Sequence, residues 1–184
     1  MTRIHAVDPT TAEGKSKTLL DAVQKKLGRT PNMTRVMAQS PAVLESYLAF
    51  SGALASGSLS AKVREQIALT VAEANACNYC LSAHTAIGGM VGLKADAIAD
   101  ARSAKASEPK VHAILALARS IVVAKGKLDD RDLSTARNAG LTDGEILEVT
   151  GNVVLTILTN YVNHVADPEI DFPAVHAGAA TTAR

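Results

Sequence analysis

The sequence predicts an all-α protein, and three observations support this prediction. Long segments carry apolar residues at three- and four-residue spacing, which is the period of an amphipathic helix. Runs of β-branched residues with period-2 alternation, which would predict strands, are nearly absent. The prolines fall between the periodic segments, where they separate one helix from the next. With 184 residues, 47% of them hydrophobic, the chain can bury the core of one globular domain.

Start and stop signals place the helices along the chain. Gly28 stops the first helix, Ser40-Pro41 joins an N-cap residue to a proline at the first helical position, and Ser60 is a further N-cap. The run Asn75-Ala76-Cys77-Asn78 is a poor helix former, so we expect a turn there. Helices are predicted over residues 12–27, 31–37, 41–57, 60–75, 77–90, 94–104, 109–125, 130–139 and 143–165.

The whole chain, residues 1–184, is expected to form a single domain with its core over about residues 15–173. The C-terminal segment 175–184 consists mainly of small and polar residues. We expect this tail to fray from Val175 onward.

Charge and composition exclude several classes of partner. The formal net charge of +1 and the absence of a long basic run argue against a nucleic-acid partner, as does an aromatic content of 3%. The N-terminal segment lacks the apolar region of a secretory signal, and the most apolar run, residues 153–158, is too short and too polar at its flanks to span a membrane. We therefore expect a cytoplasmic protein in a reducing compartment.

The chemically reactive residues gather in one stretch that includes the expected turn. Cys77 and Cys80 form a C-x-x-C, which in a reducing compartment indicates a catalytic or metal-binding pair rather than a structural disulfide. On one helix, His84 shares a face with both cysteines. Glu65 lies twelve residues before Cys77, so two helices folded back at the turn would bring it close to His84.

These four side chains form a self-consistent dithiol centre. A thiol attacks as its thiolate, which a helix N-terminus stabilises. The imidazole of His84 can accept the thiol proton while the carboxylate of Glu65 orients the ring. The second sulfur can resolve a sulfenic acid or a mixed disulfide. Spacing alone does not decide which cysteine attacks, because the first cysteine of a helical C-x-x-C is usually the more exposed.

An internal repeat with an offset of 48 residues covers the second half of the chain. Two matches fall in this one register. In the first, Lys62-Val63 matches Lys110-Val111 and Ile67-Ala68-Leu69 matches Leu115-Ala116-Leu117. In the second, Gly92-Leu93 matches Gly140-Leu141. We interpret them as a duplicated helical unit in which each copy buries the apolar face of the other; chance is the alternative, since few positions are identical. The second copy lacks the reactive residues, since Glu65, Cys77, Cys80 and His84 correspond to Ala113, Lys125, Leu128 and Asp132.

The pattern Glu-x11-Cys-x-Tyr-Cys-x3-His resembles the signature of the alkyl hydroperoxidase D-like (AhpD-like) branch of the carboxymuconolactone decarboxylase superfamily. Its members here are Glu65, Cys77, Tyr79, Cys80 and His84. The flanking segments 30–33, 40–43 and 159–164 (TPNM, SPAV and TNYVNH) resemble the longer, peroxidase-related members. The resemblance covers about residues 15–173.

This resemblance implies an all-α fold that assembles as trimers or hexamers, and dithiol-dependent reduction of hydroperoxides. It implies that Cys80 attacks the peroxide and becomes a sulfenic acid. Cys77 would donate a proton and then close the Cys77–Cys80 disulfide, with Glu65 and His84 as the proton relay. The implied reductant is a thiol or lipoyl-bearing partner protein, and no cofactor or metal is expected.

Tyr79 fits this pattern but differs from alkyl hydroperoxidase D itself, which carries a second relay histidine at this position. A phenol with a pKa near 10 donates hydrogen bonds but shuttles protons poorly at neutral pH. We include Tyr79 among the catalytic residues, with simple packing as the alternative.

Four other interpretations remain open. The cysteines could be core filler, or two thiolates, an imidazole and a carboxylate could bind zinc. The chain could be a lactone decarboxylase of the same superfamily, although those relatives generally lack the paired cysteines. It could also be a non-enzymatic redox sensor that uses the same disulfide as a switch.

Overall fold

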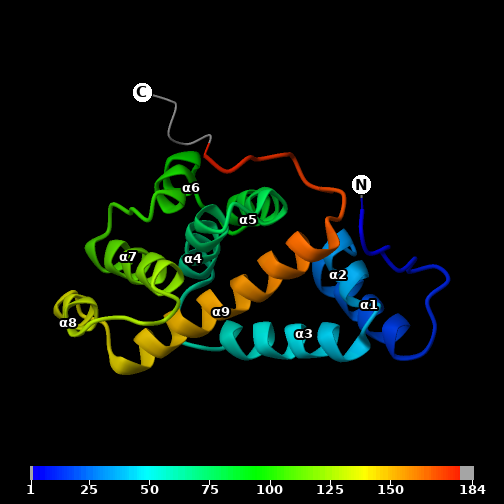
Figure 1. Cartoon of the computed structure of the whole chain (residues 1–184), viewed down its shortest axis with the longest axis horizontal. Coiled ribbons are helices and arrows are strands. Elements are labelled where there is room, and N and C mark those ends of the chain that lie inside the picture. Colours follow the sequence, from blue (N-terminus) through cyan, green and yellow to red (C-terminus); the bar gives the residue numbers. More distant parts are fainter. Residues whose placement is uncertain (1, 179–184) are drawn as a thin grey trace.

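The computed structural model describes residues 2–178, and within this range the secondary structure consists of helices without strands, as predicted (Figure 1). The helices are α1 (Gly14–Leu27), α2 (Asn32–Met37), α3 (Pro41–Ala55), α4 (Ala61–Ala74), α5 (Asn78–Met90), α6 (Ala95–Arg102), α7 (Pro109–Val123), α8 (Asp130–Asn138) and α9 (Asp143–Ala166). Every predicted helix is present, with its ends within two residues of the predicted ones.

Most of the predicted boundary signals act as expected. The Ser60 side chain accepts a hydrogen bond from the amide of Val63 at the start of α4, and Gly28 ends α1 in the left-handed conformation at φ 72°. Ser40 does occupy the N-cap of α3, but its side chain forms no capping hydrogen bond. The long helix α9 begins with a capping box between Thr142 and Glu145.

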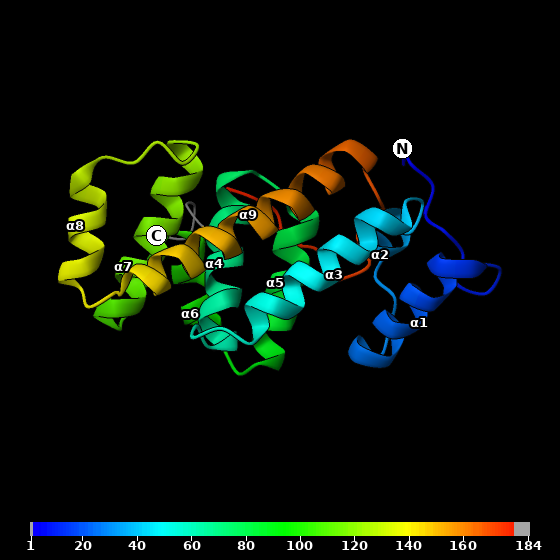
Figure 2. The same ribbon diagram turned by 90° about the horizontal axis from the view of Figure 1, so that it is seen from below.

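Helix α4 lies at the centre of the fold and packs against α5, α6, α7 and α9. Both views show α9 crossing the molecule with α3 beside it, while α1 and α2 lie at the end where α9 finishes (Figures 1 and 2). The core contains fully buried residues from four of these helices: Ile67, Leu69 and Val71 of α4, Leu81 of α5, Leu115 of α7, and Val149 and Val153 of α9. The central position of α4 therefore places Cys77 and Cys80, at the start of α5, in the protein interior, while Ala76 in the turn itself is exposed.

The helix bounds repeat with the offset seen in the sequence. Helices α4 and α7 begin 48 residues apart, and so do α6 and α9. The turns before α6 and α9 also correspond, because Gly92 and Gly140 both adopt the left-handed conformation, at φ 86° and φ 88°. Each glycine is followed by a leucine whose amide bonds back to the preceding helix, Leu93 to Gly88 and Leu141 to Ala136. These correspondences support a duplicated helical unit.

The segment after α9 returns along α5 and α4 (Figure 1). The amide of Val175 donates to Ser82 Oγ at 2.9 Å, that of Ala177 to Asn78 Oδ1 at 2.9 Å, and that of Gly178 to Glu73 Oε1 at 2.6 Å. The tail predicted to fray from Val175 is therefore held in place as far as residue 178, because polar groups of α4 and α5 satisfy its backbone amides. The rest of the predicted tail, residues 179–184, lies outside the described residues.

None of the helices in residues 2–178 combines the length and hydropathy that crossing a bilayer requires.

Candidate active site

The expected turn separates α4 from α5 and brings the reactive residues together. Ala76 adopts the left-handed conformation at φ 52°, which is uncommon for a residue other than glycine. The amide of Cys77 then bonds back to the carbonyl of Ala72 at 2.9 Å. The chain reverses within three residues, and α4 and α5 pack side by side.

Cys77 occupies the N-cap of α5, just before the first helical turn. Its Sγ accepts a hydrogen bond from the amide of Cys80 at 3.4 Å, which places its sulfur over the start of the helix. Both thiols are reduced and buried, with 1% of Cys77 and 2% of Cys80 exposed. The usual excess exposure of the first cysteine is therefore absent, and the choice between the two sulfurs depends on their surroundings.

The structure brings Glu65 and His84 together across the turn, as antiparallel packing of α4 and α5 predicts. Glu65 Oε2 lies 2.7 Å from His84 Nδ1, and about a fifth of each side chain is exposed. Burial lowers the pKa of His84, but the charge and hydrogen bond of Glu65 and the nearby Cys80 sulfur outweigh it, so the pKa of His84 is raised. The pair can therefore hold a proton at neutral pH next to the thiols.

The two thiols differ strongly in acidity. A hydrogen bond from Cys77 lowers the pKa of Cys80 to about 7, assisted by the charge of His84 and by the amides of Asn163 and Asn160, against the opposing effect of burial. The same thiol–thiol hydrogen bond and burial raise the pKa of Cys77 far above its ordinary value. Cys80 is thus the residue that becomes a thiolate near neutral pH, with the protonated Cys77 beside it.

A small apolar cavity of about 60 Å³ reaches Cys80 but not Cys77. It is lined by Leu27, Pro31, Met33, Thr34, Tyr47, Tyr79, Cys80, Ala83, His84, Ile87, Thr159 and Phe172. Access from the cavity and the lowered pKa therefore both identify the sulfur of Cys80 as the reactive one.

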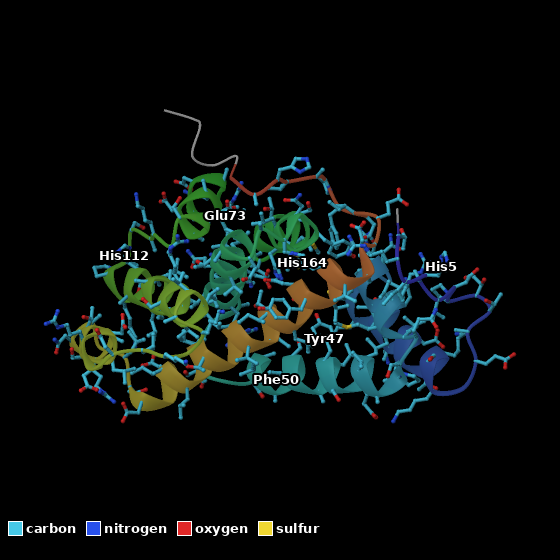
Figure 3. The ribbon with its side chains drawn as sticks, viewed as in Figure 1. His5, Tyr47, Phe50, Glu73, His112 and His164 are labelled. Atoms are coloured by element: carbon cyan, nitrogen blue, oxygen red, sulfur yellow. The ribbon has the colours of Figure 1, made fainter. Side chains whose placement is uncertain are left out.

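Tyr47 of α3 also lines this cavity and was not predicted as a site residue. Burial and the charges of Glu65 and Cys80 raise the pKa of its phenol to about 12, so the hydroxyl stays protonated. Figure 3 shows Tyr47 between α3 and α9. In the sequence it belongs to an apolar helix face, which does not distinguish a cavity residue from a core residue.

Two asparagines of α9 contact the dithiol and were not predicted as site residues. Asn163 Nδ2 donates to Cys80 Sγ at 3.2 Å, and Asn160 Oδ1 accepts from Asn75 Nδ2 at 2.8 Å. Both residues are buried, with 4% of Asn163 and 0% of Asn160 exposed. The signal in the sequence was the presence of two amides three residues apart on the face that α9 buries.

The structure does not support a relay role for Tyr79. Its hydroxyl accepts from the amide of Met33 at 3.0 Å and donates to Asp171 Oδ1 at 2.7 Å. Burial is the main cause that raises the pKa of Tyr79, so the phenol remains neutral. Both partners lie outside the cysteine–histidine–glutamate group, which favours packing, the alternative to a catalytic role for Tyr79.

The anchored segment is the chain that follows α9. Asp171 also accepts from Arg29 Nη2 at 2.7 Å and from the amide of Asn32 at 3.1 Å. Phe172 packs edge-on against Tyr79, with ring centroids 5.9 Å apart, and the guanidinium of Arg29 lies 4.4 Å from the centroid of the Phe172 ring. These contacts hold Phe172 in the wall of the cavity.

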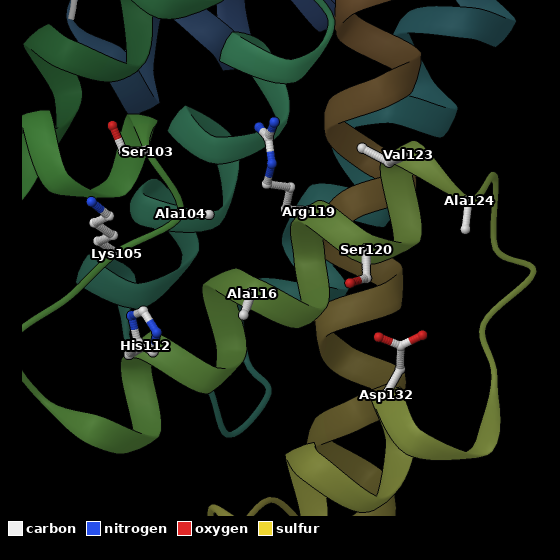
Figure 4. Close-up of a pocket in the computed structure, with 10 residues that line it drawn as sticks. All are labelled: Ser103, Ala104, Lys105, His112, Ala116, Arg119, Ser120, Val123, Ala124 and Asp132. Atoms are coloured by element: carbon white, nitrogen blue, oxygen red, sulfur yellow. The ribbon is translucent and has the colours of Figure 1, made fainter. Parts of the chain in front are cut away.

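The remaining polar clusters lie apart from the dithiol. His5, His112 and His164 are exposed and lie on separate parts of the molecule (Figure 3). A more open hollow of about 540 Å³ lies beside α7, where Lys105, His112, Arg119 and Asp132 line it (Figure 4). Among residues 2–178, no group of three or more histidine, cysteine, aspartate or glutamate side chains is placed to hold a metal ion, so the zinc set considered above is not assembled there.

Comparisons with known proteins agree with this architecture. The carboxymuconolactone decarboxylase family matches residues 41–120. An uncharacterized peroxidase-related protein from Ralstonia eutropha JMP134, described as an alkylhydroperoxidase AhpD core, is 23% identical, with a TM-score of 0.81 over 94% of this chain and 92% of its own. A peroxidase-related protein from Silicibacter sp. TM1040 is also 23% identical, with a TM-score of 0.78 over 94% of this chain and 97% of its own.

A third similar structure is the debrominase Bmp8, in which a variant with one cysteine replaced by alanine is bound to 2,3,4-tribromopyrrole. It is 16% identical, with a TM-score of 0.79 over 93% of this chain and 92% of its own. No curated protein sequence matches the chain.

The protein therefore has the all-α fold of the structure described as an alkylhydroperoxidase AhpD core. Within this fold, residues 41–120 are similar to the carboxymuconolactone decarboxylase family.

The Glu65→Gln variant tests the electrostatic coupling of the site. Losing the carboxylate removes the main effect that opposes burial, so the pKa of His84 should fall and the imidazole should be neutral at pH 7. Without that positive charge, the pH midpoint of Cys80 alkylation should rise above its starting value of about 7. NMR titration of His84 and peptide-resolved alkylation measure the two changes.

Glu73→Gln is the matched control, because Glu73 is a paired carboxylate on the same helix whose partner is Arg102. An unchanged alkylation midpoint in Glu65→Gln, or an equal shift in Glu73→Gln, would contradict the coupling.

The Tyr79→Phe variant separates anchoring from proton relay. Loss of the Tyr79 hydroxyl removes a hydrogen-bond partner from the amide of Met33 and from Oδ1 of Asp171. This loss should lower the free energy of unfolding by about 1–3 kcal/mol in denaturant titrations. The pH profile of Cys80 alkylation should not move. Tyr161→Phe, at a residue that is 58% exposed, is the control for stability. A changed alkylation profile with unchanged stability would restore the relay role.

Proposed function

We propose that this protein is a dithiol-dependent peroxidase that reduces organic hydroperoxides. The observation that carries the proposal is the contrast between its cysteines. Cys80, with a pKa of about 7, faces the cavity, while the protonated Cys77 lies against it. The Glu65–His84 pair next to them holds the proton that the reaction must move. The AhpD-like fold of the peroxidase-related relatives supports this proposal.

The first half of the reaction forms a sulfenic acid on Cys80. The thiolate attacks the terminal oxygen of the hydroperoxide, so that an S–O bond forms while the O–O bond breaks. The departing alkoxide takes a proton from the imidazolium of His84 and leaves as an alcohol. Glu65 keeps the imidazole charged and oriented for this transfer.

The second half forms the disulfide. The sulfur of Cys77 attacks that of Cys80, and the hydroxyl of the sulfenic acid leaves as water with the proton that the Cys77 thiol gives up. His84, neutral after the first half, can carry this proton from the thiol to the leaving oxygen. A partner dithiol, such as a lipoyl-bearing protein, then reduces the Cys77–Cys80 disulfide. A cytoplasmic location would supply such a reductant.

The cavity favours an apolar substrate. Its wall next to Cys80 contains the rings of Tyr47, Tyr79 and Phe172 together with aliphatic side chains. Such a wall can desolvate an alkyl or aryl group but offers few partners to a charged one.

Reductive dehalogenation is the second candidate, and the aromatic wall of the cavity is the observation that favours it. The debrominase Bmp8 shares the fold. In this chain the balanced reaction would convert a carbon–bromine bond and two thiols into a carbon–hydrogen bond, hydrogen bromide and the Cys77–Cys80 disulfide. Loss of bromide from a bromopyrrole that exceeds peroxide turnover would support this candidate over the first.

Two other interpretations, a redox sensor and a lactone decarboxylase, predict different behaviour of the same protein. A redox sensor would form the disulfide with a change in helix packing or oligomer size and with negligible turnover. A lactone decarboxylase would turn over its lactone after alkylation of both thiols.

Single substitutions of the cysteines test the peroxidase. Cys80→Ser should abolish the dithiol-supported consumption of an organic hydroperoxide. Cys77→Ser should complete one half-reaction and accumulate a sulfenic acid on Cys80, which dimedone traps for mass spectrometry. The parent should lose two thiols per equivalent of peroxide and gain an intramolecular disulfide.

His84→Asn should slow peroxide consumption by about 10²–10⁴-fold, because a proton-transfer residue typically contributes that much. His112→Asn, at an exposed histidine of α7, is the matched control. Peroxide consumption by Cys80→Ser at the rate of the parent would refute the proposal.

We also propose that the protein is a homo-oligomer that associates through one face of α9. Val154, Tyr161 and Val165 on this helix are 49%, 58% and 61% exposed. The last two line an apolar groove of about 350 Å³ that also contains Ile4 and Val43. A trimer or hexamer would remove this apolar surface from water.

A charge placed on this face should dissociate the oligomer. Light scattering of Tyr161→Asp should give the monomer mass at concentrations where the parent is a trimer or hexamer, because an interface does not tolerate an unpaired buried charge. Val123→Asp is the control, since Val123 is an equally apolar residue of α7, 67% exposed and outside the groove. A monomeric parent at micromolar concentrations would contradict the assembly.

A further inference from the structure

Helix α9 presents two buried carboxamides to the reactive sulfur. Asn160 and Asn163 are three residues apart, so both lie on the face that α9 turns toward the protein interior. A buried carboxamide is costly unless its donors and acceptors are paired. A pair of them next to a cysteine therefore needs a physical reason.

Asn163 is the closer of the two to the dithiol. Its Nδ2 donates to Cys80 Sγ at 3.2 Å, across 83 positions of the chain. The same amide also favours the ionised form of Cys77, so it acts on both sulfurs. An amide N–H that points at sulfur stabilises a thiolate more than a thiol, because a hydrogen bond to a charged acceptor is stronger.

Asn160 is oriented by a residue of the turn between α4 and α5. Its Oδ1 accepts from Nδ2 of Asn75, the residue that ends α4. This contact fixes the Asn160 carboxamide, whose Nδ2 group remains without a partner among residues 2–178 and which lowers the pKa of Cys80.

Two atoms of this pair have no hydrogen-bond partner within residues 2–178, namely Asn160 Nδ2 and Asn163 Oδ1. A donor left free beside a sulfur gains most when that sulfur carries negative charge, since the buried environment screens the interaction weakly. The arrangement is thus complementary to ionised Cys80 rather than to its neutral thiol.

We propose that Asn163 is a catalytic residue that holds Cys80 as a thiolate, and that Asn160, positioned by Asn75, completes a carboxamide cradle around that sulfur. This inference rests on the dithiol centre of the proposed function but not on peroxide as its substrate. A cradle of this kind supplies the anion with neutral donors, while Glu65 and His84 remain free to move the proton.

The cradle has a second consequence for the dithiol. It stabilises the reduced form, in which Cys80 is ionised, and it gives nothing comparable to the disulfide, which carries no charge. A dithiol with a stabilised thiolate is a stronger oxidant. Loss of the cradle should therefore raise the pKa of Cys80 and favour the disulfide, by the full factor of the pKa change only at a pH where Cys80 is fully ionised.

The test compares Asn163→Ala with Asn152→Ala in the complete protein. Asn152 is a buried asparagine of the same helix whose amide bonds to the carbonyl of Glu148, one turn back, so its loss has the same kind of structural cost. The first measurement is the rate of Cys80 alkylation by iodoacetamide against pH, resolved by mass spectrometry and made without peroxide. The second is the thiol–disulfide equilibrium against glutathione.

In Asn163→Ala, the alkylation midpoint should rise from about 7 by about one pH unit, which reduces the thiolate fraction at pH 7 about fivefold. The equilibrium constant for disulfide formation should rise about twofold at pH 7, where Cys80 is only partly ionised, and about tenfold at a pH well above both midpoints. Asn152→Ala should change neither quantity.

Asn75→Ala provides a second variant that contacts neither sulfur directly. It removes the group that orients Asn160 and should shift the alkylation midpoint in the same direction by a smaller amount. If Asn163→Ala fails to fold, a midpoint in Asn75→Ala equal to that of the parent overturns the cradle. Equal shifts in Asn163→Ala and Asn152→Ala, or no shift in a folded Asn163→Ala, also overturn it. Loss of peroxidase activity with the expected midpoint shifts would leave the cradle standing and reject peroxide as the substrate.

Discussion

The structure depends on the reversal of the chain between α4 and α5. The left-handed residue Ala76 ends α4 and lets Cys77 cap α5, so one short turn creates the helix N-terminus next to the thiols and aligns Glu65 with His84. Ala76 itself is exposed, but Cys77 and Cys80, which follow it, are buried. Burial strengthens each electrostatic contact and raises the cost of any polar group without a partner. Most polar groups of the site pair with one another, and Asn160 Nδ2 and Asn163 Oδ1 are the exceptions beside Cys80 within residues 2–178.

Helix α9 links that site to the rest of the molecule. One of its faces gives Asn160 and Asn163 to the dithiol, while another exposes Tyr161 and Val165. A residue substitution on one face can thus alter the redox centre, and a substitution on the other can alter assembly. The chain after α9 shapes the cavity. Asp171 bonds to both Tyr79 and Arg29 and thereby holds Phe172 in the cavity wall.

The asymmetry of the repeat shows how one scaffold supports chemistry in a single copy. Both copies keep the helix starts and the left-handed glycines, Gly92 and Gly140, because packing and turn geometry require them. Only the first copy has thiols, since Cys77 and Cys80 correspond to Lys125 and Leu128 in the second, and Glu65 to Ala113. The second copy contributes apolar surface and, through α9, the two asparagines.

The sequence by itself determined the helices, the turn at residues 75–78 and the approach of Glu65 to His84. These features depend on local period, capping residues and the fixed rise of a helix, all of which act over a few residues or across one turn. Only the tertiary structure decided that Cys80 is the acidic thiol, that Tyr79 anchors Asp171, that Tyr47 faces the cavity and that residues 175–178 are held against α4 and α5. Each of these depends on a contact between distant segments, such as Asn163 with Cys80, which no short-range pattern records.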